Sequence, residues 1–317
     1  MRKYQWRHRL MTGGRNIAVL LSAGCLTISG SYAASAAEAL NVKAIQTMDS
    51  TAAEVNGQQP KASVNGPKST VPTGNEAKGS RQTRSRVAII IDDFGNGMKG
   101  TDEIFSLPIK LTVAVMPFLP TSQKDAKRAH KRGDDVLVHL PMEPKSGRPE
   151  WLGPGAVLAK MTDAEVRQKV EAALENVPYA IGINNHMGSK VTGDPRIMGI
   201  ILAVCKERGL FFVDSKTNYR SVVGQVAQEI GLPRVENHIF LDDVHTASHV
   251  RKQMHLVQER ALNQRYCVTI GHVGVQGKNT AAGIRGGIED MKNTVDFIGI
   301  SDLVKEEWKW APRPTLP

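Results

Sequence analysis

The sequence contains few cysteines and few aromatic residues. Three cysteines in 317 residues are too few to staple a disulfide scaffold. Cys25 belongs to an N-terminal segment described below, which leaves Cys205 and Cys267. We expect these two to be buried thiols, with one disulfide as the alternative. Aromatic residues make up 5% of the chain and are not interleaved with a basic stripe, so the sequence does not predict nucleic-acid binding.

The sequence also lacks a large charge excess outside its first 85 residues. The formal net charge is +10 at pH 7. Residues 1–37 hold five basic residues and no acid, and residues 38–85 hold six basic and four acidic residues. Residues 86–317 are therefore close to neutral, with 30 basic and 27 acidic residues. The positive charge is concentrated at the N-terminus and gives no support for a nucleic-acid partner.

No apolar run in the sequence is long enough to span a membrane. The apolar run near the N-terminus is also short. Ile17–Ile28 spans 12 residues, fewer than the roughly 20 that a membrane-spanning helix needs. Basic residues precede it, and Ala34-Ser35-Ala36 fits an A-x-A cleavage site, so we expect residues 1–37 to be a signal peptide and the protein to be exported to the periplasm. Leu21–Cys25 resembles a lipoprotein cleavage box with its leucine one position too far from the cysteine. A membrane anchor through an uncleaved or lipidated N-terminus is therefore the alternative.

Residues 38–85 have no sustained hydrophobic period. They are rich in Ala, Gln, Asn, Gly, Ser, Thr, Pro and Lys. Such a composition buries too little apolar surface to offset chain entropy, so we predict a disordered linker. Apolar runs begin to alternate with helical patterns at Arg86. We predict one folded domain over residues 86–305 and a C-terminal tail over residues 306–317.

Eight short apolar runs in the folded part are typical of buried strands. They are Val87–Ile91, Leu111–Met116, Val136–Leu140, Ala180–Ile183, Leu210–Val213, His238–Leu241, Tyr266–Ile270 and Phe297–Ile300. Helical patterns lie near residues 122–132, 162–176, 195–208, 219–230, 246–263 and 281–294, and Thr162–Glu165 forms a capping box. Strands that alternate with helices predict a parallel sheet, and seven or eight such units predict an α/β fold of irregular barrel type.

Two adjacent carboxylates, Asp92 and Asp93, follow the first run. Side chains alternate along a strand, so we expect these two to point in opposite directions. The carboxyl ends of parallel strands are where α/β folds carry their active sites, which makes the pair a candidate for chemistry. The alternative is structural, with Asp93 capping the next helix and Asp92 solvated in a loop.

Four further runs end in polar groups. His139 lies in the third run, Asn184-Asn185-His186 follows the fourth, Asp214 follows the fifth and His272 follows the seventh. Because strand ends converge on one face of a barrel, these side chains suggest a metal site with open coordination positions. Each histidine could instead be a core residue bonded to a carbonyl, Asp214 could hold its own loop, and the asparagines could form turns.

Other histidines are weaker candidates. His238 is expected to pack against its strand, and His245, close to Asp242 and Asp243, is a minor candidate ligand. His8 lies in the signal region, and His130, His249 and His255 lie on helical stretches.

Gly95–Gly100 matches the G-x-G-x-x-G pattern of dinucleotide sites. Asp92 and Asp93 would then face the pyrophosphate, which is a conflict of like charges. No acid lies near positions 115–120 to receive the ribose. We therefore expect no nucleotide cofactor.

Five motifs together resemble the divergent polysaccharide deacetylase family, distant relatives of the NodB-type polysaccharide deacetylases. They are IDDFG at 91–95, HLPMEP at 139–144, NNHMGS at 184–189, FFVDS at 211–215 and IGH at 270–272. The resemblance implies a (β/α)7-type barrel. It also implies a hydrolase that removes acetyl groups from a cell-envelope polysaccharide and uses a divalent metal, usually zinc.

The resemblance implies a ligand set as well. Asp93, the second acid of the pair, would bind the metal. NodB-type enzymes carry His-x-x-x-His on the third strand, whereas this sequence has His139 followed by Glu143. His139 and His186 would therefore complete the set, with Glu143 as the alternative to His186.

Catalysis would depend on three further residues. By the resemblance, Asp92 would be the general base and His272 the general acid. Asp214 is expected to orient His272 and hold it charged. The expected partners are an acetylated glycan substrate and envelope proteins. The alternative function is a non-catalytic periplasmic module that uses the same barrel to bind glycan or to support envelope assembly.

Overall fold

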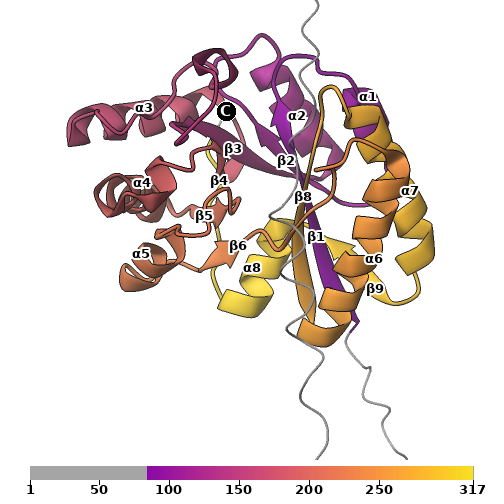
Figure 1. Ribbon diagram of the computed structural model, residues 1–317. Coiled ribbons are helices and arrows are strands. Elements are labelled where there is room, and N and C mark those ends of the chain that lie inside the picture. The colour runs from indigo at the N-terminus through magenta and orange to yellow at the C-terminus, as the bar shows by residue number, and fades with distance from the viewer. Residues whose placement is uncertain (1–83, 317) are drawn as a thin grey trace, which may run out of the picture. The chain divides into compact units, whose positions relative to one another are not determined.

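A computed structural model describes residues 84–316, in which helices surround a parallel sheet (Figure 1). The strands are β1 Ser85–Phe94, β2 Thr112–Val115, β3 Asp135–Met142, β4 Ala180–Met187, β5 Phe211–Asp214, β6 Val235–Glu236, β7 Ile239–Phe240, β8 Tyr266–His272 and β9 Val295–Ile298. The α-helices are α1 Thr101–Phe105, α2 Ser122–Arg132, α3 Asp163–Asn176, α4 Pro195–Arg208, α5 Val223–Glu229, α6 Ala247–Gln264, α7 Gly277–Met291 and α8 Ile300–Trp308. Short 3-10 turns cover Pro149–Trp151 and Val191–Gly193. The predicted signal peptide and the linker up to residue 83 lie outside the described residues.

The parallel strands form an irregular barrel. Their hydrogen-bonded order is β6-β5-β4-β3-β2-β1-β8-β7, and β9 pairs with the first half of β1. β6 and β7 stand at the two ends of this order but are separated in the chain only by Asn237 and His238. The Asn237 N–H donates to the carbonyl of Asp214, and the His238 N–H donates to that of Val268. The chain itself thus crosses the gap between β5 and β8, and the predicted α/β barrel is confirmed, with β6 and β7 acting as one interrupted strand.

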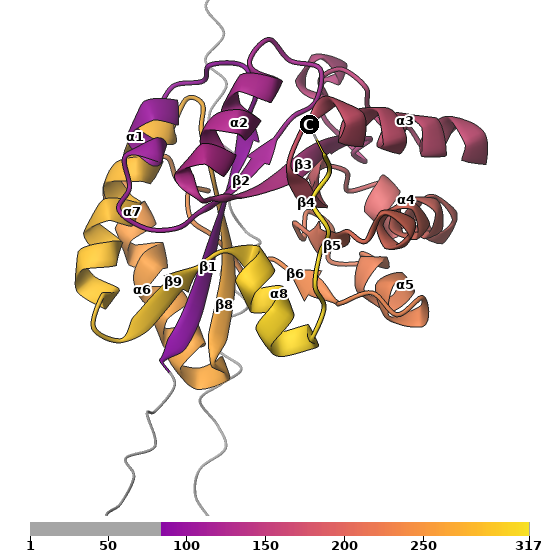
Figure 2. The same cartoon turned by 180° about the vertical axis from the view of Figure 1, so that it is seen from behind.

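The helices cover the outside of the sheet. Figures 1 and 2 show α3, α4 and α5 along one side and α1, α6 and α7 along the other. Most of the buried hydrophobic residues lie in this layer between strands and helices. Within residues 84–316, no helix combines the length and hydropathy needed to cross a membrane.

A second hydrophobic cluster fills the inside of the barrel. β1 contributes Ala88 and Ile90 to it, and α8 contributes Leu303, among other residues. α8 begins at Ile300, whose N–H donates to Oγ1 of Thr112, the first residue of β2. α8 therefore plugs the end of the barrel where the strands begin, and the opposite end remains open to polar side chains.

The predicted elements agree well with the observed ones. Each of the eight apolar runs overlaps a strand, and each of the six helical patterns overlaps a helix. The capping box is confirmed, because the Glu165 N–H donates to the Thr162 hydroxyl and the Thr162 N–H donates to the Glu165 carboxylate. β6 and α1 were missed because two and five residues are too few to show a period. The nine-residue helix α8 was not predicted either. The last run was extended too far, since Ile300 already begins α8.

The C-terminal residues pack against the barrel. α8 continues beyond residue 305, where the sequence suggested that the domain ends. Past α8, the Tyr179 N–H donates to the carbonyl of Thr315, and the Thr315 N–H donates to that of Ala180. This short pairing places the tail beside the first residue of β4.

Cys205 and Cys267 are free and buried, which confirms the prediction of two buried thiols over the disulfide alternative. Burial raises the pKa of each thiol to about 12. Both are therefore protonated at neutral pH and behave as small core residues.

Candidate metal centre

The open end of the barrel collects polar side chains from the strand ends. Along each strand, the row of residues that faces the inner cluster continues into a polar residue: Ile90 is followed by Asp92 on β1, Leu137 by His139 on β3 and Ile270 by His272 on β8. Because side chains alternate, residues two apart share a face. The apolar floor and the polar site above it are thus built by the same strand faces.

Asp92 and Asp93 both face this site, contrary to the predicted opposite directions. The register between β1 and β2 shifts by one residue between Ile91 and Phe94, and Asp93 has a φ of 69°, in the left-handed region. His139 consequently lies near both acids, with Nδ1 3.7 Å from Asp92 Oδ2 and Nε2 3.4 Å from Asp93 Oδ1. The prediction was wrong because a β-bulge turns the second carboxylate inward.

Asp93, His139 and His186 direct one ligand atom each toward a common point. Asp93 Oδ1 lies 3.1 Å from His186 Nδ1, and the His139 Nε2 and His186 Nδ1 atoms are also 3.1 Å apart. All three atoms lie within 4.8 Å of one another. One carboxylate oxygen and two imidazole nitrogens are a ligand set that divalent transition metals accept. We call these three residues the triad, and they could hold a metal ion.

The outer hydrogen bonds of the two rings determine which nitrogen carries the proton. His139 Nδ1 lies 2.9 Å from Asn184 Oδ1, and His186 Nε2 lies 3.0 Å from the carbonyl oxygen of Trp151. Oxygen acceptors require donors, so these two nitrogens are protonated. In the neutral form of each ring the inner nitrogen, His139 Nε2 or His186 Nδ1, then carries a lone pair. Asp93 Oδ1, which points at the same place, is buried without a hydrogen-bond partner among the described residues. Three converging lone pairs repel one another unless a cation lies between them, so the triad fits a metal ion.

Asp92 lies beside the triad without belonging to it. Its side chain is buried, and Asn184 Nδ2 donates to its Oδ1 at 2.8 Å. Burial raises the pKa of Asp92, against the attraction of the His139 and His272 rings. A buried carboxylate of raised pKa next to a metal site has the properties of a general base.

His272 is held by a carboxylate that the sequence analysis did not assign. It stands opposite Asp92 in the pairing of β1 with β8. Its Nδ1 lies 2.8 Å from Asp242 Oδ1, and Asp242 Oδ2 accepts from the His272 N–H and from the Thr280 hydroxyl. Burial alone would lower the pKa of His272, but the hydrogen bond and charge of Asp242, together with the charges of Asp93 and Asp92, raise it to about 9. The ring is therefore an imidazolium at neutral pH.

Sequence comparison identifies the family. The divergent polysaccharide deacetylase family matches residues 89–304. The chain belongs to this family. A relative from Haemophilus influenzae is 34% identical over 233 residues, which cover 74% of this chain and 81% of the relative. YibQ of Escherichia coli is 34% identical over 187 residues, which cover 59% of this chain and 58% of YibQ. Both relatives carry the description of an uncharacterized protein.

The fold also occurs in a solved structure, that of an uncharacterized protein from Agrobacterium tumefaciens C58. The two structures align with a TM-score of 0.65 at 19% sequence identity, over 71% of this chain and 91% of that one. At this identity the likeness concerns the fold alone. The barrel fold is thus shared with a distant protein.

Asp214 does not take the place predicted for it beside His272. On β5, Phe211 and Val213 face the inner cluster, so Asp214 is turned to the other face. It accepts the N–H of Lys216, the ammonium of which lies 3.9 Å away. Asp242, rather than Asp214, bonds His272. Asp242 directly follows a predicted strand, and this position was the signal that could have identified it.

Glu143 is also directed away from the triad. Its Oε1 lies 2.6 Å from the Lys190 ammonium, and its Oε2 accepts the Ala159 N–H. The triad therefore contains His186, and the alternative ligand is occupied elsewhere. His245 is exposed and lies outside the triad.

The two asparagines after β4 have different roles. Asn184 connects Asp92 with His139 through its amide. Asn185 accepts the Ser215 N–H and donates to the Met187 carbonyl, so it holds the loops together.

Proposed function

We propose that this member of the divergent polysaccharide deacetylase family is a metal-dependent hydrolase that removes acetyl groups from a polysaccharide of the cell envelope. The observation that carries the proposal is the convergence of three lone pairs from Asp93, His139 and His186 at the open end of the barrel. Two imidazoles and one carboxylate favour zinc among the divalent ions. The donor set also leaves positions for water and for the acetyl oxygen.

A metal ion held by the triad would polarise the acetyl carbonyl and activate water for attack. Asp92 accepts the proton that the attacking water loses. Its carboxylate is not a triad member, and Asn184 occupies only its Oδ1 atom, so Oδ2 is available for that proton. Because burial raises the pKa of Asp92, the carboxylate is a better base than an exposed aspartate.

His272 supplies the proton that the leaving amine or alkoxide needs. Asp242 keeps the ring protonated at neutral pH and, through Nδ1, fixes its orientation. Nε2 is then the nitrogen that carries a transferable proton. Asp92 and His272 stand opposite each other on neighbouring strands, which suits a base and an acid on two sides of one acetyl group.

An acetylated glycan substrate, export to the periplasm and envelope protein partners belong to the same proposal. Its supports are the family description and the N-terminal pattern of basic, apolar and small residues. The linker before residue 86 would then give the barrel reach within the envelope.

Metal content tests the triad. Purified full chain, loaded with zinc and desalted, should carry about one metal ion by elemental mass spectrometry. Asp93→Ala, His139→Ala and His186→Ala should each lose it. Glu143→Gln is the matched control and should keep it, because Glu143 bonds Lys190 instead. A parent protein without metal after zinc loading would contradict the hydrolase.

Acetate release tests the reaction. An N-acetylated chitooligosaccharide and an O-acetylated xylooligosaccharide separate amide from ester cleavage. Asp92→Asn should retain the metal and lower kcat by roughly 10² to 10⁴. Acetate release from neither substrate by the metal-loaded parent would favour the non-catalytic glycan-binding module.

A further inference from the structure

Two adjoining hollows lie along the segments that follow β3 and β4, and they share Lys145 and Ser146. The first has a cavity volume of about 420 Å³ and lies between the segment after β3 and the end of β4. The second continues past Ser189 to Tyr219. Together they form one surface, which we call the basic groove.

The basic groove carries an excess of positive charge. Its lining includes five basic side chains and one carboxylate: Lys145, Arg148, Lys160, Lys190, Arg220 and Glu143. Lys190 pairs with Glu143. Among residues 84–316, no carboxylate lies within ion-pair distance of the other four cations. A cluster of exposed cations without partners attracts anionic ligands.

The groove is connected directly to the triad. The Trp151 carbonyl accepts from His186, and the Lys145 N–H donates to the Ser189 hydroxyl, three residues after that ligand. The Lys190 N–H donates to the Glu143 carbonyl. The walls of the groove are therefore the same segments that position His186.

One exposed aromatic ring, that of Tyr219, lines the groove, and a second, that of Trp151, lies next to the lining residue Arg148. Trp151 is 60% exposed and Tyr219 is fully exposed. The Arg148 guanidinium lies 5.5 Å from the centre of the Trp151 ring. Flat apolar rings next to cations suit a ligand with both apolar faces and negative charge, which describes an acidic sugar better than a neutral one.

We propose that the basic groove binds a polysaccharide that carries anionic groups, carboxylates or phosphates, and so brings an acetyl group of that chain to the triad. This inference rests on the proposed function and adds the substrate class. The near-neutral charge of residues 86–317 does not oppose it, because the groove gathers cations from separate loops.

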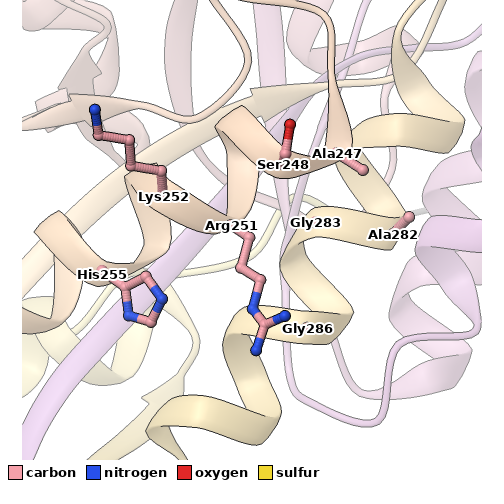
Figure 3. Close-up of a pocket in the computed structure, with 8 residues that line it drawn as sticks. All are labelled: Ala247, Ser248, Arg251, Lys252, His255, Ala282, Gly283 and Gly286. Carbon is pink, nitrogen blue, oxygen red and sulfur yellow. The ribbon is translucent and has the colours of Figure 1, made fainter.

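A hollow between α6 and α7 is also basic but suits an anionic chain less well. Arg251 donates to both carboxylate oxygens of Asp290, at 2.7 and 2.8 Å, and His255 lies 3.6 Å from the same carboxylate. Figure 3 shows the side chains of Arg251 and Lys252 extending in different directions from α6. In this hollow Arg251 and His255 are paired with Asp290, and Lys252 points away from Arg251, so these cations do not form one anionic binding surface.

Binding to the metal-free full chain, prepared with a chelator, tests the groove independently of hydrolysis. The probe is fluorescently labelled hexagalacturonate, and its neutral methyl ester is the reference. Phosphorylated dextran against plain dextran forms the second arm and separates phosphate from carboxylate recognition. We expect at least one anionic probe to bind more tightly than its neutral reference by fluorescence anisotropy or competition.

A triple variant, Lys145→Gln/Arg148→Gln/Lys160→Gln, should bind the anionic probe roughly tenfold more weakly, since each exposed ionic contact contributes modestly. The control variant Lys127→Gln/Lys131→Gln/Lys252→Gln removes the same charge from α2 and α6 and should bind like the parent. Equal weakening in both variants would overturn the proposal, because net charge alone would then explain binding. Neutral references that bind as tightly as the anionic probes would also overturn it.

Three further results distinguish a glycan from other anionic ligands, and the groove from the hydrolase. A single-stranded oligonucleotide or an anionic vesicle could outcompete both glycans, and its binding could be weakened only in the groove variant. That result would overturn the proposal of a glycan ligand in favour of the competitor. Binding of the anionic probes without any acetate release would support the anionic ligand of the groove and contradict the proposed hydrolase. Acetate release from a neutral chitooligosaccharide, with no binding of the anionic probes, would support the hydrolase and overturn the anionic ligand of the groove.

Discussion

His139 Nε2 and His186 Nδ1 face each other at 3.1 Å, while the opposite nitrogen of each ring donates to an oxygen. Two lone pairs at this distance are unfavourable without a cation. The amide of Asn184 and the carbonyl of Trp151 thus determine which nitrogen of each ring is free to bind a metal. Such outer partners fix both tautomer and orientation in metal sites.

Replacing Asn184 with alanine tests this coupling. Without its Oδ1, the Nδ1 of His139 loses its acceptor, and the ring is free to turn or to change tautomer. We expect metal affinity to fall by about 10- to 100-fold, measured by competition with a chromogenic chelator. Asn279→Ala is the control, because Asn279 bonds the carbonyl of exposed His245. Equal affinity in the parent and the Asn184 variant would show that the outer bond is dispensable.

Most of the fold and of the triad could be predicted from the sequence for one reason. Each triad member lies at or directly after an apolar run, and parallel strands bring their carboxyl ends together. Their positions made Asp93, His139 and His186 candidates, while the choice of these three as the ligand set came from the resemblance to the deacetylase family. The prediction was weaker wherever the direction of a side chain mattered.

Two such directions illustrate the limit. The inward turn of Asp93 depends on a bulge and a positive φ, which an aspartate adopts only when tertiary contacts favour it. Asp214 was expected to face His272, but it lies one residue out of step with the inner row of Phe211 and Val213. Because side chains alternate along a strand, Asp214 cannot face His272 once Phe211 and Val213 are known to point inward.

The basic groove could not be predicted from the sequence either. Lys145, Lys160 and Arg220 come from separate segments, and nearly balanced charges elsewhere in residues 86–317 hide them. A count along the chain cannot reveal a cluster that exists only in space.

A comparison of Asp242→Asn with Asp214→Asn distinguishes the structural assignment from the sequence prediction. Asp242 bonds the ring of His272, so its loss should leave the ring neutral at pH 7 and lower kcat by roughly 10², with little change in KM. Asp214→Asn should alter kcat less than about threefold, because its carboxylate bonds Lys216 instead. The readout is initial-rate kinetics across pH. The opposite ranking of the two variants would restore the sequence prediction.

The stability of the metal-free protein should depend on the charge of His272. Its folded pKa of about 9 lies above the ordinary value of 6.5, so protonation favours the folded state. This contribution is fully present below pH 6.5 and is lost as the pH rises through about 9. The difference in denaturation midpoint between the parent and His272→Gln should therefore shrink between pH 6 and pH 10. A difference that stays constant over this range would show that Asp242 does not hold the ring charged.

The plug formed by α8 accounts for the apolar floor beneath the site, and Leu303→Ala tests it. Leu303 is fully buried in the inner cluster, whereas Leu262 on α6 is 53% exposed. Truncating a buried leucine leaves a cavity and should cost about 2–5 kcal/mol of unfolding free energy, while Leu262→Ala should cost less than about 1 kcal/mol. Urea titrations of the two variants give the comparison. Because the triad is carried by the opposite ends of the strands, metal affinity should change little in the folded Leu303 variant. A Leu303 variant as stable as the Leu262 variant would mean that α8 does not close the barrel.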